Sequence, residues 1–274
     1  MTDVVGAQAQ DAKMPEWLER FKYFRDPPSR ERIQQWLNLF EAAHLDVAIK
    51  VLDHVTVVGE RDILSGYKAA LSAMPGWSAK AAARKGRWFF VGFGKQGESG
   101  PAMLRLFREA NDLANACHDP LFKSLSDLPS LQLTAYDHVV FVDDFSGTGR
   151  QVTRLWPRVA ELVASEAKCY LVLTAITEVA KKSIEEKTEL ELSAQYTLGS
   201  EHSVFLGENQ IFSEDEKIVI QEYCASADPR NPKGFGDLGM LFILSHKTPN
   251  NVLPILYQNT DQWRGLFPRY LRAA

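Results

Sequence analysis

One stretch, from His138 to Gln151, limits the fold more than any other part of the chain. It begins with the run HVVFV, whose apolar and mostly β-branched residues predict a buried strand. Asp143 and Asp144 follow this run, and we expect them to end the strand at the surface of a cleft. A turn rich in hydroxyl groups and glycine, FSGTGR, then leads into a helical pattern. This order predicts a strand, a loop and a helix that together can hold a phosphate group.

The loop contains the chemical groups that an anion needs. Gly147 and Gly149 carry no Cβ atom, so backbone N–H groups can approach an anion closely, and Ser146 and Thr148 add hydroxyl donors. The helix that follows adds unpaired N–H groups and a partial positive charge. The two carboxylates would repel a phosphate that is bound by this loop. We therefore expect them to face sugar hydroxyls or a Mg²⁺ ion shared with the ligand.

A plainer interpretation of this stretch is also open. An apolar strand that ends in two aspartates and a Gly-Thr-Gly turn also occurs as ordinary connection between a strand and a helix. In that case Ser146 or Thr148 would only cap the helix. The motif as a whole favours ligand binding over simple capping.

The segments around this stretch predict an α/β fold with a mostly parallel sheet flanked by helices. Strands are expected at 87–93, 168–176 and 190–198, with a helix at 177–187 and a short further strand at 131–133. A strand–helix–strand crossover joins parallel strands with a right-handed connection, and ligands bind at the carboxyl ends of such strands. One face of the helix after the loop is apolar, at Val152, Leu155, Trp156, Val159, Leu162 and Val163.

The run from Val139 to Gly149 resembles the ribose-5-phosphate loop of the type I phosphoribosyltransferases. In that family an apolar strand, two acidic residues, three variable residues and Thr-Gly precede a helix. The resemblance implies that Asp143 and Asp144 are the catalytic pair and hold the ribose 2′ and 3′ hydroxyls of phosphoribosyl pyrophosphate. The sequence departs from the family pattern at Gly147 and Gln151, where hydroxyl side chains are usual. The 5-phosphate would be bound by Ser146, Gly147, Thr148, Gly149 and Arg150.

A second glycine-rich loop, GKQGESG at 94–100, follows the aromatic strand expected at 87–93 and precedes a helix pattern. Its position in the sequence matches the pyrophosphate loop of the same family. The resemblance implies that the backbone amides from Gly94 to Gly100, Gly97 among them, bind the pyrophosphate together with the Lys95 ammonium. Ser99 would cap the following helix.

The N-terminal part of the chain is expected to form a helical layer. We divide the chain into a helical region at 1–80 and an α/β domain at 81–274, and we expect residues 1–13 to lack regular structure. Ile33, Trp36 and Leu37 share one face of a helix. A later helix is expected to begin near Asp62, with Ile63, Tyr67 and Leu71 turned inward.

Composition excludes several classes of protein. The charge is −4, from 31 basic and 35 acidic residues, which argues against strong non-specific binding of nucleic acid. The three cysteines are far apart, as is typical of a reducing compartment. We find no run that is long and apolar enough for a membrane span and expect no signal peptide. These features predict a cytoplasmic protein that does not contact a membrane.

The C-terminal part extends the resemblance. A buried apolar run at 238–244, a Thr-Pro-Asn-Asn turn, a second apolar run and a tail with Trp263, Arg264, Phe267 and Arg269 follow the α/β segments. Together with the helical N-terminus, this order resembles the PRTase-CE group, which is phosphoribosyltransferase-like and associated with bacterial conflict and defence loci. The resemblance covers about Arg30 to Arg269. It implies an effector role in anti-phage systems, including some retrons, with a partner protein from the defence system.

Three functions remain open from the sequence. The first is an enzyme that binds a phosphoribosyl or nucleotide ligand with Mg²⁺ and makes or breaks a bond at the ribose anomeric carbon. The second is a catalytically inactive nucleotide-sensing or partner-binding module, which is favoured because 116–137 contains no evident flexible catalytic loop. The third is a nucleotide binder unrelated to phosphoribosyl chemistry. Because the chain has neither a G-x-S-x-G elbow nor a Walker A motif, a serine hydrolase and a motor ATPase are disfavoured.

Overall fold

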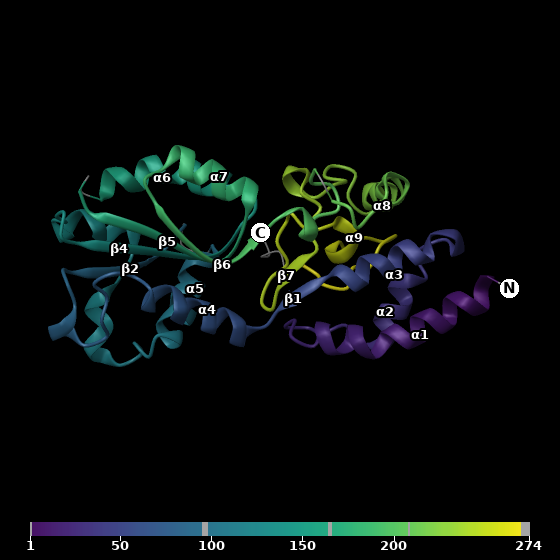
Figure 1. Cartoon of the computed structure of the whole chain (residues 1–274), viewed down its shortest axis with the longest axis horizontal. Helices are drawn as coiled ribbons and strands as arrows, with labels where there is room; N and C mark the ends of the chain where they lie inside the picture. The colour runs from purple at the N-terminus through teal and green to yellow at the C-terminus, as the bar shows by residue number, and fades with distance from the viewer. Residues whose placement is uncertain (1, 95–97, 164–165, 208, 270–274) are drawn as a thin grey trace. The chain divides into compact units, whose positions relative to one another are not determined.

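The computed structural model describes residues 2–94, 98–163, 166–207 and 209–269, with side chains from residue 10 onward. Contacts within the chain divide it into two compact units (Figure 1). One unit is Arg61–Leu198, and the other combines Met1–Glu60 with Gly199–Ala274. We describe each unit by itself.

The unit Arg61–Leu198 contains a five-stranded sheet in the order β3-β2-β4-β5-β6. Every neighbouring pair is parallel, so the predicted parallel sheet is confirmed. β4 is the central strand, and Val140 lies between Phe90 of β2 and Tyr170 of β5. The strands are β2 (Trp88–Gly92), β3 (Phe122–Lys123), β4 (His138–Ser146), β5 (Lys168–Thr177) and β6 (Glu191–Leu198).

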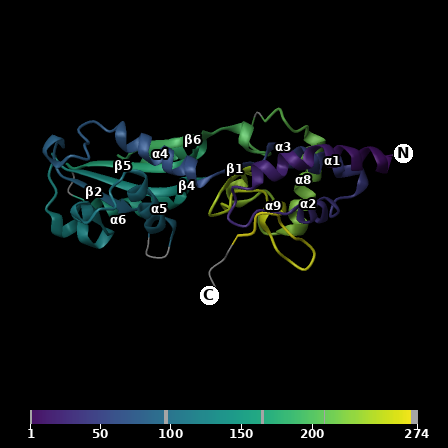
Figure 2. The ribbon, with the colours of Figure 1, turned by 90° about the horizontal axis from the view of Figure 1, so that it is seen from below.

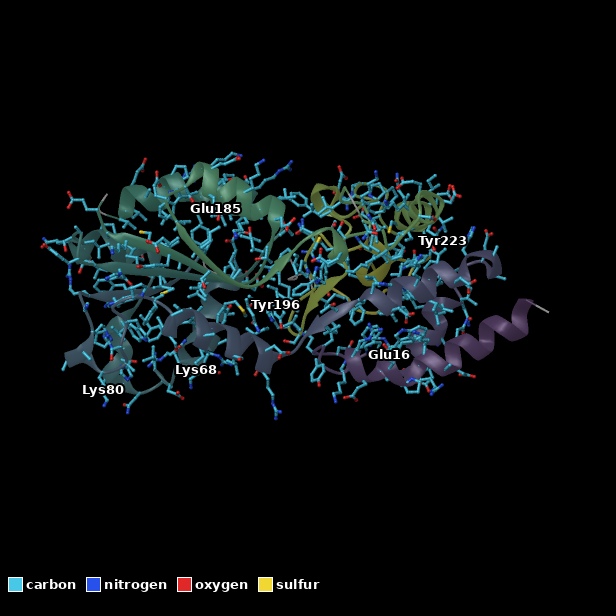
Figure 3. All side chains as sticks on the ribbon, viewed as in Figure 1. Glu16, Lys68, Lys80, Glu185, Tyr196 and Tyr223 are labelled. Carbon is cyan, nitrogen blue, oxygen red and sulfur yellow. The ribbon has the colours of Figure 1, made fainter. Side chains whose placement is uncertain are left out.

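Helices cover both faces of this sheet (Figure 1). α6 (Arg150–Leu162) and α7 (Glu178–Lys187) lie on one face, and α4 (Glu60–Ser72) and α5 (Ser99–Ala110) lie on the other, which Figure 2 shows from their own side. Figure 3 shows Glu185 of α7 and Lys68 of α4 on opposite sides of the sheet. The expected helices near Asp62, after the central loop and at 177–187 are therefore confirmed.

Two different cores fill the two faces. On the α6 and α7 face, side chains from alternate strand positions pack against Trp156 in one apolar cluster. On the other face, Phe107 of α5 packs between Tyr67 of α4 and Phe90 of β2. Each fully buried large apolar side chain contributes about 1.5–3 kcal/mol to the stability of the fold. A shift of the strand pairing by one residue would turn such side chains to the opposite face of the sheet. The two cores therefore fix the register of β4.

The connection between β3 and β4 differs from the prediction. A strand was expected at 131–133, but a 3₁₀ helix, η4 (Leu125–Leu131), occupies the start of that segment. Gln132 then adopts a left-handed conformation with φ 47°, which ends the helix and cannot continue a strand. Two further 3₁₀ helices of this unit are η2 (Ala81–Ala83) and η3 (Ala116–Leu121).

The second unit is mainly helical and holds a two-stranded parallel sheet of β1 (Thr56–Val58) and β7 (Phe242–Leu244). The predicted helix face at Ile33, Trp36 and Leu37 is buried as expected. A capping box opens a later helix, because Ser213 Oγ accepts from Glu216 N and Glu216 Oε2 accepts from Ser213 N. The α-helices of this unit are α1 (Thr2–Phe21), α2 (Arg30–Leu37), α3 (Leu45–His54), α8 (Glu214–Ala227) and α9 (Pro254–Tyr257). Its 3₁₀ helices are η1 (Ala42–His44), η5 (Ser200–His202) and η6 (Phe235–Asp237).

The N-terminus corrects another expectation, because residues 2–21 form α1 and not an irregular segment. Met14, Trp17 and Phe21 are buried at helical spacing. The Trp17 indole also donates to Asp53 Oδ1 of α3 at 2.8 Å, and the Arg20 guanidinium donates to Asp53 O and Leu52 O. The apolar stripe starts only at residue 14, so the first turns of the helix lack the pattern that would have predicted them.

The division at residues 60 and 198 also differs from the expected boundary at residue 80. β1 lies before that boundary but pairs with β7, which is about 185 residues further along the chain. α4 also lies before it, and Tyr67 of α4 donates its hydroxyl to Asp143 O of β4 at 2.9 Å. No helix in the described ranges is long and apolar enough to cross a membrane.

Candidate functional site

The carboxylates lie within the central strand and not at its end. Asp143 is in register with Leu173 of β5, and pairing with β5 continues to Ser146. On the other side, the last residue of β2 in register with β4 is Gly92, opposite Val142, and Phe93 N donates to Val142 O at 2.8 Å. The acidic pair therefore begins where β2 ends and β4 continues. Asp143 and Asp144 are only 4% and 1% exposed, which corrects the expectation that they end a strand at an open surface.

Asp143 is bound by the first turn of α5. The Ser99 hydroxyl donates to Asp143 Oδ1 at 2.6 Å, and Asp144 N donates to the same oxygen at 2.9 Å. The expectation that Ser99 caps α5 is corrected, because Glu98 is the N-cap residue and makes no side-chain capping bond. The structure therefore brings the start of α5 and the acidic pair together, although 44 residues separate Ser99 from Asp143.

Tyr67 of α4 contacts the backbone of the acidic pair. Its hydroxyl donates to Asp143 O and lies 3.5 Å from Thr174 Oγ1. Burial raises the pKa of the Tyr67 hydroxyl, and the negative charges of Asp144 and Asp143 raise it further, so it stays protonated and remains a donor. The sequence placed Tyr67 only in the core. The sequence did hold a signal that Tyr67 has a polar partner. It is a tyrosine at an inward position next to aliphatic ones, and a buried phenol needs a hydrogen-bond partner.

The loop after β4 is held by the junction of β5 and α7. Thr177 Oγ1 donates to Gly147 O and accepts from Ala180 N at 3.0 Å, so one side chain fixes the loop and caps α7. Gly149 is the N-cap residue of α6 and has φ 71°. A Cβ atom there would lie 3.1 Å from Ala180 O, so glycine is needed for both conformation and space.

The hydroxyl groups of the loop do not act as helix caps in the ordinary way. Ser146 is buried at the end of β4, and Thr148 is half-buried. Thr148 Oγ1 accepts only a long bond from Arg150 N, at 3.4 Å, while the N-cap position itself is occupied by Gly149. The capping interpretation therefore accounts poorly for both hydroxyls.

The second glycine-rich loop lies against the end of β2. A Cβ atom at Gly100 would lie 2.1 Å from Phe93 O, and one at Gly92 would lie 2.7 Å from the carbonyl carbon of Gly100. These glycines allow the backbone of α5 to lie directly on the strand end. Lys95 and Gly97, the other residues expected to bind pyrophosphate, lie outside the described residues.

The first turns of α5 and α6 also meet beside a pocket. Gln151 Nε2 donates to Glu98 Oε2 at 3.3 Å. The pocket has a volume of about 300 Å³ and is lined by Glu98, Gln151, Arg154, Leu155 and Arg158. Sequence reasoning did not identify Arg154 or Arg158, because two exposed arginines on a helix are ordinary surface residues.

For a metal ion, the acidic pair offers two carboxylates on adjacent residues. Successive residues of a strand point to opposite faces, so the two groups do not form a cage. Within the described ranges, no group of three or more His, Cys, Asp or Glu side chains is placed to hold a metal ion. The donor set fits Mg²⁺ only as an ion held largely by the oxygens of a ligand and by water.

Comparisons with known proteins give the following matches. The sequence model of the PRTase-CE family matches residues 33–269. Among solved structures, the chain is similar to a hypoxanthine-guanine-xanthine phosphoribosyltransferase, with a TM-score of 0.32 and 10% identity, over 56% of this chain and 86% of that one. The search of curated proteins gives no match.

Proposed function

The chain belongs to the PRTase-CE family, and from this premise we propose that this phosphoribosyltransferase-like protein binds a phosphoribosyl or nucleotide ligand at the carboxyl end of β4. The observation that carries the proposal is the direct connection of a buried carboxylate pair to a glycine loop and a helix N-terminus. Donors for a phosphate and acceptors for sugar hydroxyls lie within a few residues of one another. Phosphoribosyl pyrophosphate contains both groups.

The phosphate would bind at Gly147–Arg150. The N–H groups of the first turn of α6 have no partners within the helix, and the helix dipole favours an anion there. The Thr148 hydroxyl is half-buried and next to these groups. Arg150 is exposed at the first position of α6 and would add a charge-assisted bond.

The ribose would bind at the carboxylates. Ser99 donates to Asp143 Oδ1 as a sugar hydroxyl would, so it stands in for the ligand. Because Asp143 is 4% exposed and Ser99 donates to its Oδ1, a ribose at this oxygen would have to displace the Ser99 hydroxyl at the first turn of α5. Asp143 and Asp144 would hold Mg²⁺ together with the oxygens of the ligand, and the ion would supply positive charge for a leaving pyrophosphate.

We extend the proposal to a reaction at the ribose anomeric carbon. Such a reaction passes through a positively charged sugar, so the protein has to hold the ribose and the phosphates rigidly and stabilise charge. In this proposal the carboxylates of Asp143 and Asp144 would hold the ribose and stabilise this charge. In the cell, the proposed role is that of a cytoplasmic effector in bacterial anti-phage defence, acting with a partner protein, and the resemblance to the defence-associated PRTase-CE group supports it.

One observation favours a second candidate function. The carboxylates are almost fully covered, and Asp143 is already hydrogen-bonded to Ser99 and Asp144 N. A protein that senses a nucleotide does not have to react with it. Such a protein needs only a site whose shape changes when the ligand displaces Ser99. An enzyme would form ribose 5-phosphate or a ribosylated product, and a sensor would form neither.

The test is a calorimetric titration of phosphoribosyl pyrophosphate with Mg²⁺ into the wild type and Asp143→Asn/Asp144→Asn. We expect binding by the wild type and at least a hundredfold weaker binding by the variant. The matched control is Glu185→Gln/Glu186→Gln, which removes two charges from exposed positions of α7 and should bind as the wild type does.

Circular dichroism decides whether the aspartate variant is folded. Because both aspartates are buried, we expect their replacement to lower its unfolding free energy by about 1–3 kcal/mol without unfolding it. Thr148→Val changes a half-buried residue and leaves both buried aspartates in place, and we expect it to weaken binding as well. Undiminished binding by both variants would contradict the assignment.

A further inference from the structure

The pocket beside α6 has an unusual charge pattern. The helix carries Arg150, Arg154 and Arg158 at every fourth position, and its first turn contains no acidic residue. Like charges four residues apart repel each other, and positive charges at a helix N-terminus oppose the helix dipole. The sequence of α6 is therefore unfavourable for an isolated helix in both respects, and an anion bound beside it would reverse both effects.

The two arginines that line the pocket have no partner among the described residues. Within the part of the chain that the structure describes, neither Arg154 nor Arg158 makes a hydrogen bond, an ion pair or a ring contact. Glu98 lines the same pocket, yet it accepts a hydrogen bond from Gln151 and not from either guanidinium. Both guanidinium groups are thus left with their donors directed to solvent or to a ligand.

The size and lining of the pocket narrow the class of ligand. Its volume of about 300 Å³ is at the lower end of the range for small-molecule sites. Arg154 and Arg158 are one helical turn apart, about 6 Å along the axis, and guanidinium groups bind phosphate oxygens in pairs of hydrogen bonds. Leu155 adds an apolar part of the lining, and the Glu98 carboxylate can accept from a hydroxyl group of a ligand.

We propose that this pocket is a separate binding site for a small phosphorylated molecule, with Arg154 and Arg158 as its phosphate ligands. The site lies further along α6 than the loop Gly147–Gly149 and does not use the carboxylates of β4. The proposal thus goes beyond the phosphoribosyl site and does not depend on it. Binding here would also bear on the start of α5, because Glu98 immediately precedes Ser99, which holds Asp143.

The probe is inorganic pyrophosphate, titrated by calorimetry into the full chain at low ionic strength. We expect a binding event that weakens at least tenfold in Arg154→Gln/Arg158→Gln. Lys181→Gln/Lys182→Gln is the matched control, because it removes two exposed positive charges from the neighbouring helix α7, outside the pocket. Thr148→Val removes a hydroxyl of the loop and separates the two sites. Both of these variants should keep the event within twofold.

Thermal unfolding provides the check on folding. Without pyrophosphate, the arginine variant should unfold at a temperature no lower than the wild type, since repulsion along α6 is relieved. With pyrophosphate, the unfolding temperature of the wild type should rise and that of the arginine variant should not.

Three results would overturn the proposal. The first is no binding of pyrophosphate by the wild type. The second is an equal loss in the arginine and lysine variants, which would mean that only net charge matters. The third is loss of the same event in Thr148→Val, which would place the anion in the loop and leave the phosphoribosyl site as the only one.

Discussion

At the scale of single residues, the site is defined by contacts between distant positions. Ser99 binds Asp143, Tyr67 binds the Asp143 carbonyl, and Thr177 binds the Gly147 carbonyl. The sequence identified Asp143, Asp144 and Ser99 as site residues from local motifs. It could not identify their partners, because a hydroxyl group in a helix or strand has the same local pattern whether or not it meets a carboxylate.

The Ser99 contact can be tested by stability. Ser99→Ala removes a 2.6 Å hydrogen bond to a buried carboxylate, so we expect the unfolding free energy to fall by about 1–3 kcal/mol in urea denaturation. Ser65→Ala, at an exposed position of α4, is the control and should change it by less than about 0.5 kcal/mol. Equal stability of Ser99→Ala and the wild type would mean that the bond is not formed in solution.

A second residue-scale prediction concerns pH. Arg87 donates to Asp137, whose carboxyl also accepts from Thr134 N at 2.7 Å and from the Thr134 hydroxyl. These bonds, that of Arg87 first, lower the pKa of Asp137 to about 2. Because the folded pKa lies below the unfolded value of about 3.9, the carboxylate stabilises the fold above pH 4.

That stabilisation is lost as the pH falls from about 4 to 2. Urea denaturation over this range should therefore show a steeper loss of stability for the wild type than for Asp137→Asn. At pH 7 the variant should be less stable by about 1–3 kcal/mol. Parallel pH profiles for the two proteins would show that the ion pair does not contribute.

At the scale of elements, the unit of strand, loop and helix around Asp143 was largely predictable. Buried strands and one-sided helices have local periods that the sequence shows directly, so β4, α6 and β5 appear where expected. The strand continues through the aspartates to Ser146 because β5 still pairs with it there, which no local pattern reveals. The same is true of β3, a two-residue strand that depends on β2.

The start of α6 gives a prediction at this scale. Gly149→Ala places a Cβ at φ 71° and 3.1 Å from Ala180 O, so we expect a loss of about 1–3 kcal/mol in unfolding free energy. Gly207→Ala is a matched control, since Gly207 has φ 28° but no atom within 4 Å of the added Cβ. A loss no greater than that of the control would show that α6 does not pack on α7 as described.

At the scale of the whole molecule, the division of the chain was the least predictable feature. The pairing of β1 with β7 joins segments near the two ends of the sequence, and each strand has only three residues. Short parallel strands far apart in the sequence have no signal of their own. The sequence therefore showed the types of element in each region but not which regions form one compact unit.

Fragments of the chain test this division. We expect the fragment 61–198 to unfold cooperatively in urea, because it retains the sheet and the four helices that cover it. The fragment 81–274 lacks α4 and leaves α8, α9 and β7 without α1 to α3, so it should expose apolar surface and aggregate. Circular dichroism and size-exclusion chromatography distinguish the two. A soluble, cooperative 81–274 with an unfolded 61–198 would support a boundary at residue 80.

The most direct test of the proposed site is a crystal structure of the full chain with phosphoribosyl pyrophosphate and Mg²⁺. We expect the 5-phosphate against the backbone N–H groups of Gly147–Arg150 and a ribose hydroxyl within hydrogen-bond distance of Asp143, with the Ser99 hydroxyl displaced from Oδ1. A ligand bound elsewhere, with the bond between Ser99 and Asp143 intact, would contradict the proposed site.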